Sequence, residues 1–286
     1  MTTLHLSRDA PVVLVDSSYF MIHRIFATAR WWAIRNAYRG KMSSQKAVIS
    51  ALLFDDQKFV SALEKHMRTD ILKIQKQWGL IGRANKQVAP NNIIFCKDCS
   101  QASIWRMNVY PDYKKNRPTD ETSNLACLKD VKVEPSVLGE FQQAYHPHLE
   151  ADDVACLLFR QVRAIMGDKQ KIILITGDHD YLQLKDAHSE IYGLPNKNLW
   201  EAGLNKGTTN ITRKILMGDV SDNIPRIFGK RDIEIFMELQ CEDERTAYLQ
   251  KKGKMDDFAR NKTLMCWSQI PEQVVNSFND KFMIDG

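Results

Sequence analysis

Carboxylates follow three apolar runs of the sequence at the point where each run ends. The runs are short, mostly bulky or β-branched, and without strict alternation, which is typical of strands buried on both faces of a parallel sheet. The acids concerned are Asp16 after residues 12–15, Asp98 after residues 93–96, and Asp178 and Asp180 after residues 171–176. Because ligands of open α/β sheets bind at the carboxyl ends of the strands, we expect these side chains to share one edge of the sheet.

Five further acids occur in two clusters. The stretch LEADD carries Glu150, Asp152 and Asp153 directly before an amphipathic helix, and GDVSDNIP carries Asp219 and Asp222. Turn formation would explain the acids of TGDHD, and helix capping would explain part of LEADD. However, three acids in four residues exceed what a helix cap needs.

The whole set predicts a metal site. Nine carboxylates without a histidine or cysteine ligand pattern beside them favour Mg²⁺ or Mn²⁺ over zinc. Carboxylates this close together repel one another unless a cation lies between them. Two such ions can clamp the attacking and leaving oxygens of a phosphodiester during hydrolysis. We therefore predict a metal-dependent phosphodiesterase.

A basic segment, WRMNVYPDYKKNRP, follows Asp98 closely. We interpret it as a helix whose cations contact phosphates, and an ordinary solvated helix face is the alternative. Its basic residues are Arg106, Lys114, Lys115 and Arg117.

The strands alternate with long segments of helical periodicity, such as residues 57–78, which suit crossover connections. This alternation predicts an α/β fold with a mostly parallel central sheet. From about residue 196 onward the pattern is largely helical.

Five motifs in sequence order make the chain recognisable: VDSSYF, WRMNVYPDYKKNRP, LEADD, TGDHDYLQL and GDVSDNIP. This order resembles the 5′-nuclease (flap endonuclease) superfamily, and within it most closely the ribonuclease H group of T-even-type phages. The resemblance implies a three-layer α/β/α, PIN-like core. It also implies a Mg²⁺-dependent 5′→3′ exonuclease and flap endonuclease that removes RNA primers or 5′ flaps during DNA replication.

The resemblance also implies roles for single residues, with two Mg²⁺ ions (or Mn²⁺) as cofactors. The ligands near the reactive ion would be Asp16, Asp98, Glu150, Asp152 and Asp178, with Asp153 beside them. The second ion would be held or oriented, in part through water, by Asp180, Asp219 and Asp222. Arg106 and Lys114 would neutralise the scissile phosphate, and Tyr113 would lie near the cleavage site as an aromatic stacking surface.

Two regions follow from the same resemblance. Residues 1–195 would form the nuclease core, including a helical arch region at about 113–149, and residues 196–286 would form a helical DNA-binding region. The family places a glycine-rich turn after GDxxDNIP, but here RIFGKRDIEIF contains only Gly229. We therefore expect side chains, rather than backbone amides, to contact duplex phosphates. The nucleic-acid contacts outside the catalytic set would be Lys115, Arg117, Arg226, Lys230 and Arg231.

Composition is consistent with a nucleic-acid enzyme. The formal net charge of the 286 residues is +5, although nine acids are assigned to the metal site. The six cysteines show neither a disulfide framework nor a zinc pattern. No apolar stretch reaches membrane-spanning length and the N-terminus lacks a signal-peptide pattern, so we expect a cytoplasmic protein, in a host cell if the source is a phage. Expected partners are branched or nicked DNA and RNA–DNA duplexes and, by family resemblance, a single-strand binding protein and a sliding clamp.

Two other functions were weighed. A haloacid-dehalogenase-like phosphatase needs a second aspartate two residues after the nucleophile, but Ser17 and Ser18 follow Asp16. A branched-DNA-binding protein without cleavage is the alternative that stays open. Such a protein would not need nine carboxylates, because carboxylates without a cation repel phosphate.

Overall fold

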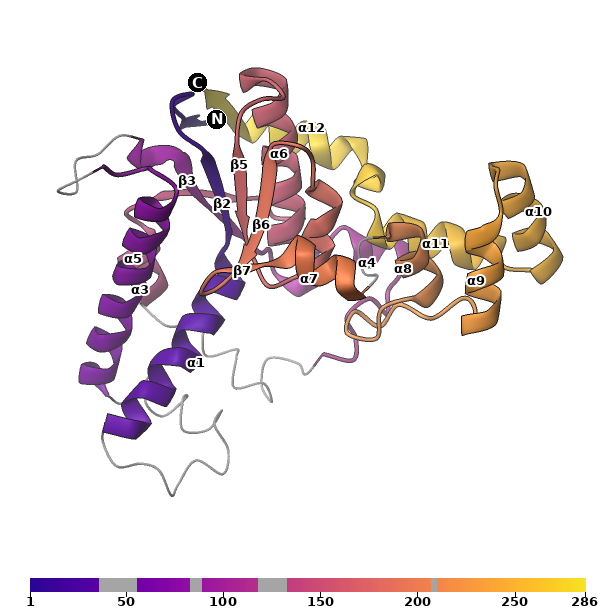
Figure 1. The fold of residues 1–286 in the computed structure, drawn as a ribbon, viewed down its shortest axis with the longest axis horizontal. Coiled ribbons are helices and arrows are strands. Elements are labelled where there is room, and N and C mark those ends of the chain that lie inside the picture. The colour runs from indigo at the N-terminus through magenta and orange to yellow at the C-terminus, as the bar shows by residue number, and fades with distance from the viewer. Residues whose placement is uncertain (36–55, 83–88, 118–132, 207–209) are drawn as a thin grey trace.

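The computed structural model describes residues 1–35, 56–82, 89–117, 133–206 and 210–286 (Figure 1). Its centre is a six-stranded sheet with the order β4-β3-β2-β5-β6-β7. The strands are β2 (Val12–Asp16), β3 (Ile93–Lys97), β4 (Gln142–Tyr145), β5 (Ile172–Ile175), β6 (Ser189–Gly193) and β7 (Lys197–Asn198). All pairs are parallel except β6 with β7.

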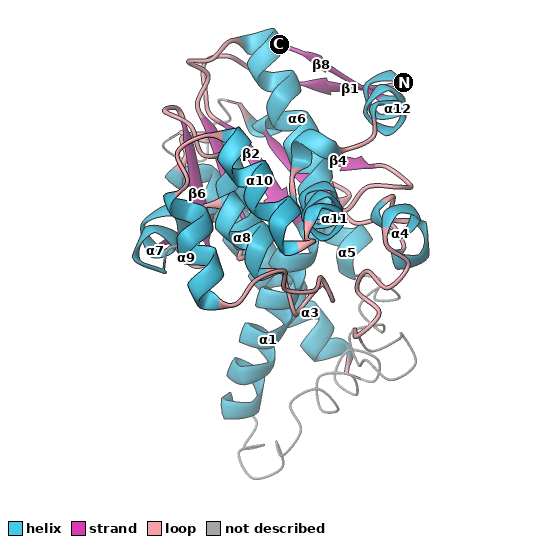
Figure 2. Ribbon diagram, turned by 90° about the vertical axis from the view of Figure 1, so that its right-hand side faces the viewer, coloured by secondary structure: helices cyan, strands magenta, loops and turns pink. Residues whose placement is uncertain are grey.

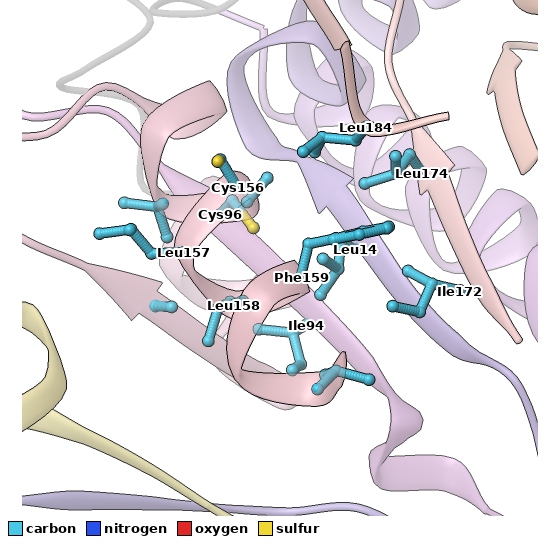
Figure 3. Packing of buried hydrophobic residues seen from close by; sticks show 14 of the residues in the cluster. Leu14, Ile94, Cys96, Cys156, Leu157, Leu158, Phe159, Ile172, Leu174 and Leu184 are labelled. Carbon is cyan, nitrogen blue, oxygen red and sulfur yellow. The ribbon is translucent and has the colours of Figure 1, made fainter. Parts of the chain in front are cut away.

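Two layers of helices cover the sheet. One face packs against α1 (Ser17–Arg35), α3 (Gln57–Gln77) and α5 (Val133–Leu138); the other packs against α6 (Ala151–Met166), the 3₁₀ helix η6 (His179–Leu184) and α7 (Leu199–Lys206). Successive side chains of a strand point to opposite faces, so Val13 and Val15 pack in one core and Val12 and Leu14 in the other. Figure 3 shows the second core, where Leu158 and Phe159 of α6 lie over Leu14 and Ile94.

A third apolar cluster holds the helices that extend away from the sheet in Figure 1. These helices are α8 (Ile211–Met217), α9 (Lys230–Glu238), α10 (Glu242–Lys252) and α11 (Met255–Met265). They pack around Phe228 and Phe236 and against Ile104 and Tyr113, which flank the short helix α4 (Arg106–Val109). The segment after β3 therefore joins the sheet edge to the C-terminal helices.

The end of the chain returns to the core and forms a separate two-stranded sheet with the first strand. After the 3₁₀ helix η7 (Trp267–Gln269), α12 (Glu272–Lys281) packs Phe278 into the core beneath α6, and β8 (Phe282–Asp285) pairs in parallel with β1 (Thr2–His5). Figure 2 shows β1 and β8 side by side near α12. The range 196–286, predicted as a DNA-binding region, thus also contributes to the nuclease core.

The strand order places a topological switch point beside β2. The chain passes from β2 to β3 and β4 on one side, and later to β5 and β6 on the other. Ligands of open α/β sheets bind where the order reverses. The carboxyl ends of β2 and β5 are therefore the expected place for a site.

The predicted α/β fold with a mostly parallel sheet is confirmed, and the helix predicted over 57–78 is α3. Two expectations are wrong in detail. The basic segment is helical only over Arg106–Val109 and continues as turns to residue 117, because Pro111 lacks the N–H that a continuing helix needs. Residues 142–145, inside the predicted arch region, form the edge strand β4. Residues 118–132 of that region lie outside the described residues.

Within the described ranges, no helix is both long enough and apolar enough to cross a membrane.

Gly218 provides a stability test of the loop that carries Asp219. Its φ is +68°, and a Cβ would lie 2.5 Å from the carbonyl oxygen of Ile224. Gly253 also has a positive φ, +62°, but has no atom within 4 Å of an added Cβ. Gly218→Ala should therefore lower the unfolding free energy by about 3 kcal/mol, and Gly253→Ala by only about 1 kcal/mol. Urea denaturation measures both, and equal losses would show that the close approach at Gly218 is unimportant.

Candidate metal centre

Asp16 is the last residue of β2, and its carboxylate accepts hydrogen bonds from the start of α1 and from the residue after β5. Its carboxylate accepts the Tyr19 N–H at 3.0 Å and the Thr176 hydroxyl at 3.1 Å. The Thr176 oxygen accepts the N–H of Asp178 at 3.1 Å. Thr176 therefore links the acids that follow β2 and β5.

Asp98 follows β3 and connects the starts of two helices. Its carboxylate accepts the Ala151 N–H at the start of α6 at 2.8 Å and the Ser18 hydroxyl in the first turn of α1 at 2.5 Å. Asp152 lies in the first turn of α6, and one of its oxygens lies within 4.8 Å of oxygens of Glu150 and Asp153. The start of α6 thus adds its acids to those at the strand ends.

The acids of this first group lack a neutralising partner among the residues that the structure describes. In the described part of the chain, Asp16, Asp98, Asp152 and Asp178 form no ion pair. Burial, together with the charge of Asp98, raises the pKa of Asp16 to about 7. Burial and the charge of Asp153 also raise the pKa of Asp152 well above its usual value.

This electrostatic state fits a divalent cation. A bound cation stabilises the ionised form of each carboxylate and removes the mutual repulsion that raises the pKa. The donors are all carboxylate oxygens, which suit a hard ion such as Mg²⁺ or Mn²⁺. Asp16, Asp98 and Asp178, which act on one another electrostatically, could therefore hold a metal ion. Asp152 could add a ligand from the start of α6, where its oxygen lies close to those of Glu150 and Asp153.

Asp180 and Asp219 form a second group that contains its own cation. The Lys214 ammonium forms an ion pair with Asp180 and lies 3.4 Å from a carboxylate oxygen of Asp219. Asp219 also accepts the N–H and the hydroxyl of Ser221 at 2.8 and 2.6 Å. Burial raises the pKa of Asp219, but Ser221 and Lys214 outweigh that effect, so the pKa is lowered overall.

Arg106 is the centre of a buried ion network. Its guanidinium binds both oxygens of Asp153 at 2.7 Å, Glu150 at 2.9 Å and the carbonyl of Leu264 at 2.8 Å. Asp153 is fully buried and also accepts the indole N–H of Trp105 at 2.9 Å. A guanidinium so engaged contacts no phosphate in this conformation. Asp153 likewise has its oxygens occupied, and it accepts the Glu150 N–H at 3.4 Å, as a helix cap does.

Lys114 continues this network toward Asp222. Its ammonium forms an ion pair with Glu150 and lies 3.7 Å from Asp222, while the Tyr113 hydroxyl donates to Glu150 at 2.9 Å or to Asp222 at 3.1 Å. Arg117 binds Asp222 at 2.6 Å and is 47% exposed. Burial raises the pKa of Glu150, but Lys114 and Arg106 more than offset it and lower the pKa overall.

The structure therefore divides the nine predicted ligands into three groups. The first lies at the strand ends and the start of α6 and forms no ion pair among the described residues, the second surrounds Lys214, and the third belongs to the Arg106–Lys114 network. The groups are Asp16, Asp98, Asp152 and Asp178; Asp180 and Asp219; and Glu150, Asp153 and Asp222. The ligand and phosphate roles of all these residues remain predictions.

The predicted nucleic-acid contacts lie apart from the buried network. Lys115, Arg226, Lys230 and Arg231 are exposed, and Lys115 pairs with Asp112 at 2.8 Å. Of these five predicted contacts, Arg117 is the one that pairs with a predicted metal ligand, Asp222.

Sequence reasoning missed several residues that shape this centre. Thr176 and Ser18 position acids through hydroxyl groups, and Trp105 binds Asp153. Lys214 was the largest omission. A signal existed, since a lysine one helical turn before a Gly-Asp turn can fold back on that aspartate.

The sequence belongs to a known class of nucleases. Residues 11–212 match the model of the N-terminal resolvase-like domain of 5′–3′ exonucleases. Because this match covers more than half of the chain, the chain belongs to the 5′–3′ exonuclease family, and the predicted superfamily is confirmed.

Two relatives are DNA polymerase I from two strains of Streptococcus pneumoniae, each 24% identical over 215 residues. The matches cover 69% of this chain and 22% of each polymerase, so the chain spans about a fifth of the length of these relatives.

Solved structures from bacteriophage T5 share the fold. The T5 5′-exonuclease with bound zinc has a TM-score of 0.58 and 17% identity, with 95% of this chain and 97% of that chain covered. The T5 flap endonuclease in a pseudo-enzyme-product complex with DNA and metal ions has a TM-score of 0.55 and 16% identity, with coverages of 94% and 96%. The finer resemblance to the T-even group stays a prediction.

The raised pKa of Asp16 predicts a pH-dependent stability of the metal-free protein. Folded Asp16 holds its proton more tightly than unfolded Asp16, so its contribution is present below pH 3.8 and is lost as the pH rises to about 7. The whole loss is about 4 kcal/mol, of which about 3 kcal/mol falls between pH 5 and 8. Thermal unfolding in EDTA from pH 5 to 8 should show this fall, Asp16→Asn should flatten it, and Mg²⁺ at pH 8 should reverse it.

The exposed Asp168 lies before β5, on the loop from α6, and provides the control. Asp168→Asn should keep the wild-type slope. If Asp16→Asn also keeps it, the carboxylate of Asp16 is not held in the environment described.

The burial of Arg106 predicts a structural effect of its loss. Arg106→Met leaves Asp153 buried without its partner and should lower the unfolding free energy by about 3–5 kcal/mol. Lys115→Met removes an exposed ion pair and should cost less than about 1 kcal/mol. Urea denaturation compares them. A fully stable Arg106→Met protein that cleaves slowly would instead support the phosphate role predicted from the sequence.

Proposed function

We propose that the chain is a divalent-metal-dependent 5′→3′ exonuclease and flap endonuclease that hydrolyses phosphodiesters at 5′ ends of branched or nicked DNA and of RNA–DNA duplexes. The observation that carries the proposal is the group Asp16, Asp98, Asp152 and Asp178 at the switch point of the sheet. In the described chain these carboxylates have no internal cation, and burial already raises the pKa of Asp16 and Asp152.

The residues of the chain would divide the work of such a reaction. Asp16, Asp98, Asp152 and Asp178 would hold one ion, while Asp180 and Asp219 would hold or orient the second. When bound, two divalent ions supply activation of the attacking water and stabilisation of the leaving oxygen. Mg²⁺ is the proposed natural ion, because oxygen ligands and phosphate substrates suit it best.

The basic residues would take roles according to their exposure. Arg117 is 47% exposed and Lys114 11% exposed, whereas Arg106 is 3% exposed. We therefore assign phosphate neutralisation to Lys114 and Arg117, and the positioning of Glu150 and Asp153 to Arg106. Tyr113 is buried among the same acids, so its hydroxyl would orient Glu150 and Asp222 rather than stack on a base.

The duplex would lie against the exposed cations Arg226, Lys230 and Arg231 around the start of α9. Their loss should weaken binding without regard to sequence and should lessen its salt dependence. Both polymers carry the same phosphates, so we expect RNA and DNA to be accepted at the 5′ end. A role in removing primers or flaps during replication, beside a single-strand binding protein and a sliding clamp, belongs to the same proposal.

Asp178→Asn tests the function. This change keeps the side-chain shape but removes one ligand charge, so single-turnover cleavage of a 5′ flap in Mg²⁺ should slow by orders of magnitude. Affinity for the flap in Ca²⁺ should persist or increase, because a negative charge facing phosphate is lost. Asp180→Asn should have a milder effect if its ion is held through water.

Asp168→Asn is the matched control, since it removes the same charge before β5, outside the predicted ligand set, and should cleave at the wild-type rate. Near-normal cleavage by Asp178→Asn would contradict the metal assignment. Tight flap binding by a wild-type protein that cuts neither DNA nor RNA flaps in Mg²⁺ or Mn²⁺ would support the alternative of a branched-DNA-binding protein.

A further inference from the structure

Lys214 lies where the second group of acids would receive a metal ion. Its ammonium pairs with Asp180, which follows β5, and lies 3.4 Å from Asp219 in the loop after α8. The three side chains are similarly buried, with exposed fractions of 24%, 20% and 22% for Lys214, Asp180 and Asp219. The pair therefore has one cation that both carboxylates share.

The local backbone fixes this arrangement. Lys214 is in the last turn of α8, and its carbonyl accepts the N–H of Gly218 at 3.0 Å. Asp219 then exchanges two backbone hydrogen bonds with Ile224, of 2.9 and 2.8 Å. The helix end and the turn thus return the Asp219 carboxylate to the lysine of the preceding turn.

The contrast with the first group is electrostatic. Asp16, Asp98 and Asp178 form no ion pair in the described ranges, whereas Asp180 and Asp219 share the Lys214 ammonium. An incoming divalent ion therefore has no ammonium of the described residues to displace at the first group. At Asp180 and Asp219 it must first displace an ammonium that already supplies positive charge.

We propose that Lys214 is an internal competitor for the second divalent ion. Its ammonium neutralises Asp180 and Asp219 until an ion replaces it, so the two ions bind with unequal affinity. This inference rests on the proposed metal-dependent function. A displaced Lys214 stays attached to α8 beside the centre, where a substrate phosphate can pair with it, so substrate should favour occupation of the second site.

The test measures Mn²⁺ binding to the full chain without substrate. Isothermal titration of EDTA-treated protein should resolve one tighter and one weaker class of sites. Lys214→Met should strengthen the weaker class by about tenfold and leave the tighter class unchanged. Adding an uncleaved flap with a modified scissile phosphate should strengthen the weaker class in the wild type more than in Lys214→Met.

Arg213→Gln is the matched control. Arg213 is the neighbouring cation on α8, but its guanidinium binds both oxygens of Glu234 at 2.8 and 2.7 Å. The Arg213→Gln substitution also removes one positive charge, but at a distance from Asp180 and Asp219. It should change the affinity of the weaker class of sites by less than about twofold, as expected for a screened surface charge.

Three results overturn the inference. The Mn²⁺ affinity of the weaker sites could be unchanged in Lys214→Met, it could fall in that variant, or it could rise equally in Arg213→Gln. Lys214→Gln provides a second variant of similar length if the methionine variant is unstable by thermal unfolding. A wild-type protein that binds no Mn²⁺ at all would instead contradict the proposed metal-dependent function itself. The two failures are therefore distinguishable.

Discussion

Repulsion between carboxylates at the end of the parallel sheet is the constraint on which the other features of the centre depend. The strand order brings the ends of β2, β3 and β5 together, and an acid follows each of them. Hydrogen-bond donors offset part of the repulsion, as Thr176 and Tyr19 do for Asp16. Among the described residues, cations pair with the second and third groups of acids but not with the first. The proposed external ion would offset the repulsion that remains in the first group.

Two other acids, Glu150 and Asp153, help to attach the C-terminal helices to the sheet. Arg106 joins Glu150 and Asp153 at the start of α6 to the carbonyl of Leu264 at the end of α11. Nearby, the Lys114 N–H donates to the carbonyl of Asp222, and the Asn223 side chain donates to the carbonyl of Asp112, at 2.9 and 2.7 Å. Lys114 and Asn223 both have a φ of +57°, a strained conformation that reciprocal hydrogen bonds of this kind can hold. The acidic cluster at the start of α6 and the attachment of the helices are therefore one structural unit.

The sequence predicted the parts of this structure that depend on local pattern. Buried strands at about residues 12–15, 93–96 and 171–176, the helix over 57–78 and the clustering of acids all follow from periodicity and from the rule on strand ends. The partners of each acid could not be predicted, because Arg106 reaches Asp153, and Lys214 reaches Asp180, only through tertiary contacts. The strand β4 was missed because QQAY, at a sheet edge, has little of the apolar character of the central strands. The return of β8 to the start of the chain was missed for another reason, because its pairing with β1 joins the two ends of the sequence and leaves no local pattern.

The type of cation in each group is consistent with the role assigned to it. A guanidinium is a rigid fork, and Arg106 uses it to bind both oxygens of Asp153 within a site that is closed to solvent. Exchange of that partner would leave a buried carboxylate unpaired, which is costly. Lys214 instead carries a compact ammonium group on a flexible chain, and it contacts two acids that are partly accessible, Asp180 and Asp219. Lys114 is intermediate, because it pairs with the buried Glu150 and also lies 3.7 Å from the more accessible Asp222. A lysine can leave such a partner for a phosphate at smaller cost, because the released carboxylate can bind water or a metal ion. Arginine therefore suits the permanent connection to the C-terminal helices, and a lysine at Lys214 suits the exchange of ions and substrate that we propose there.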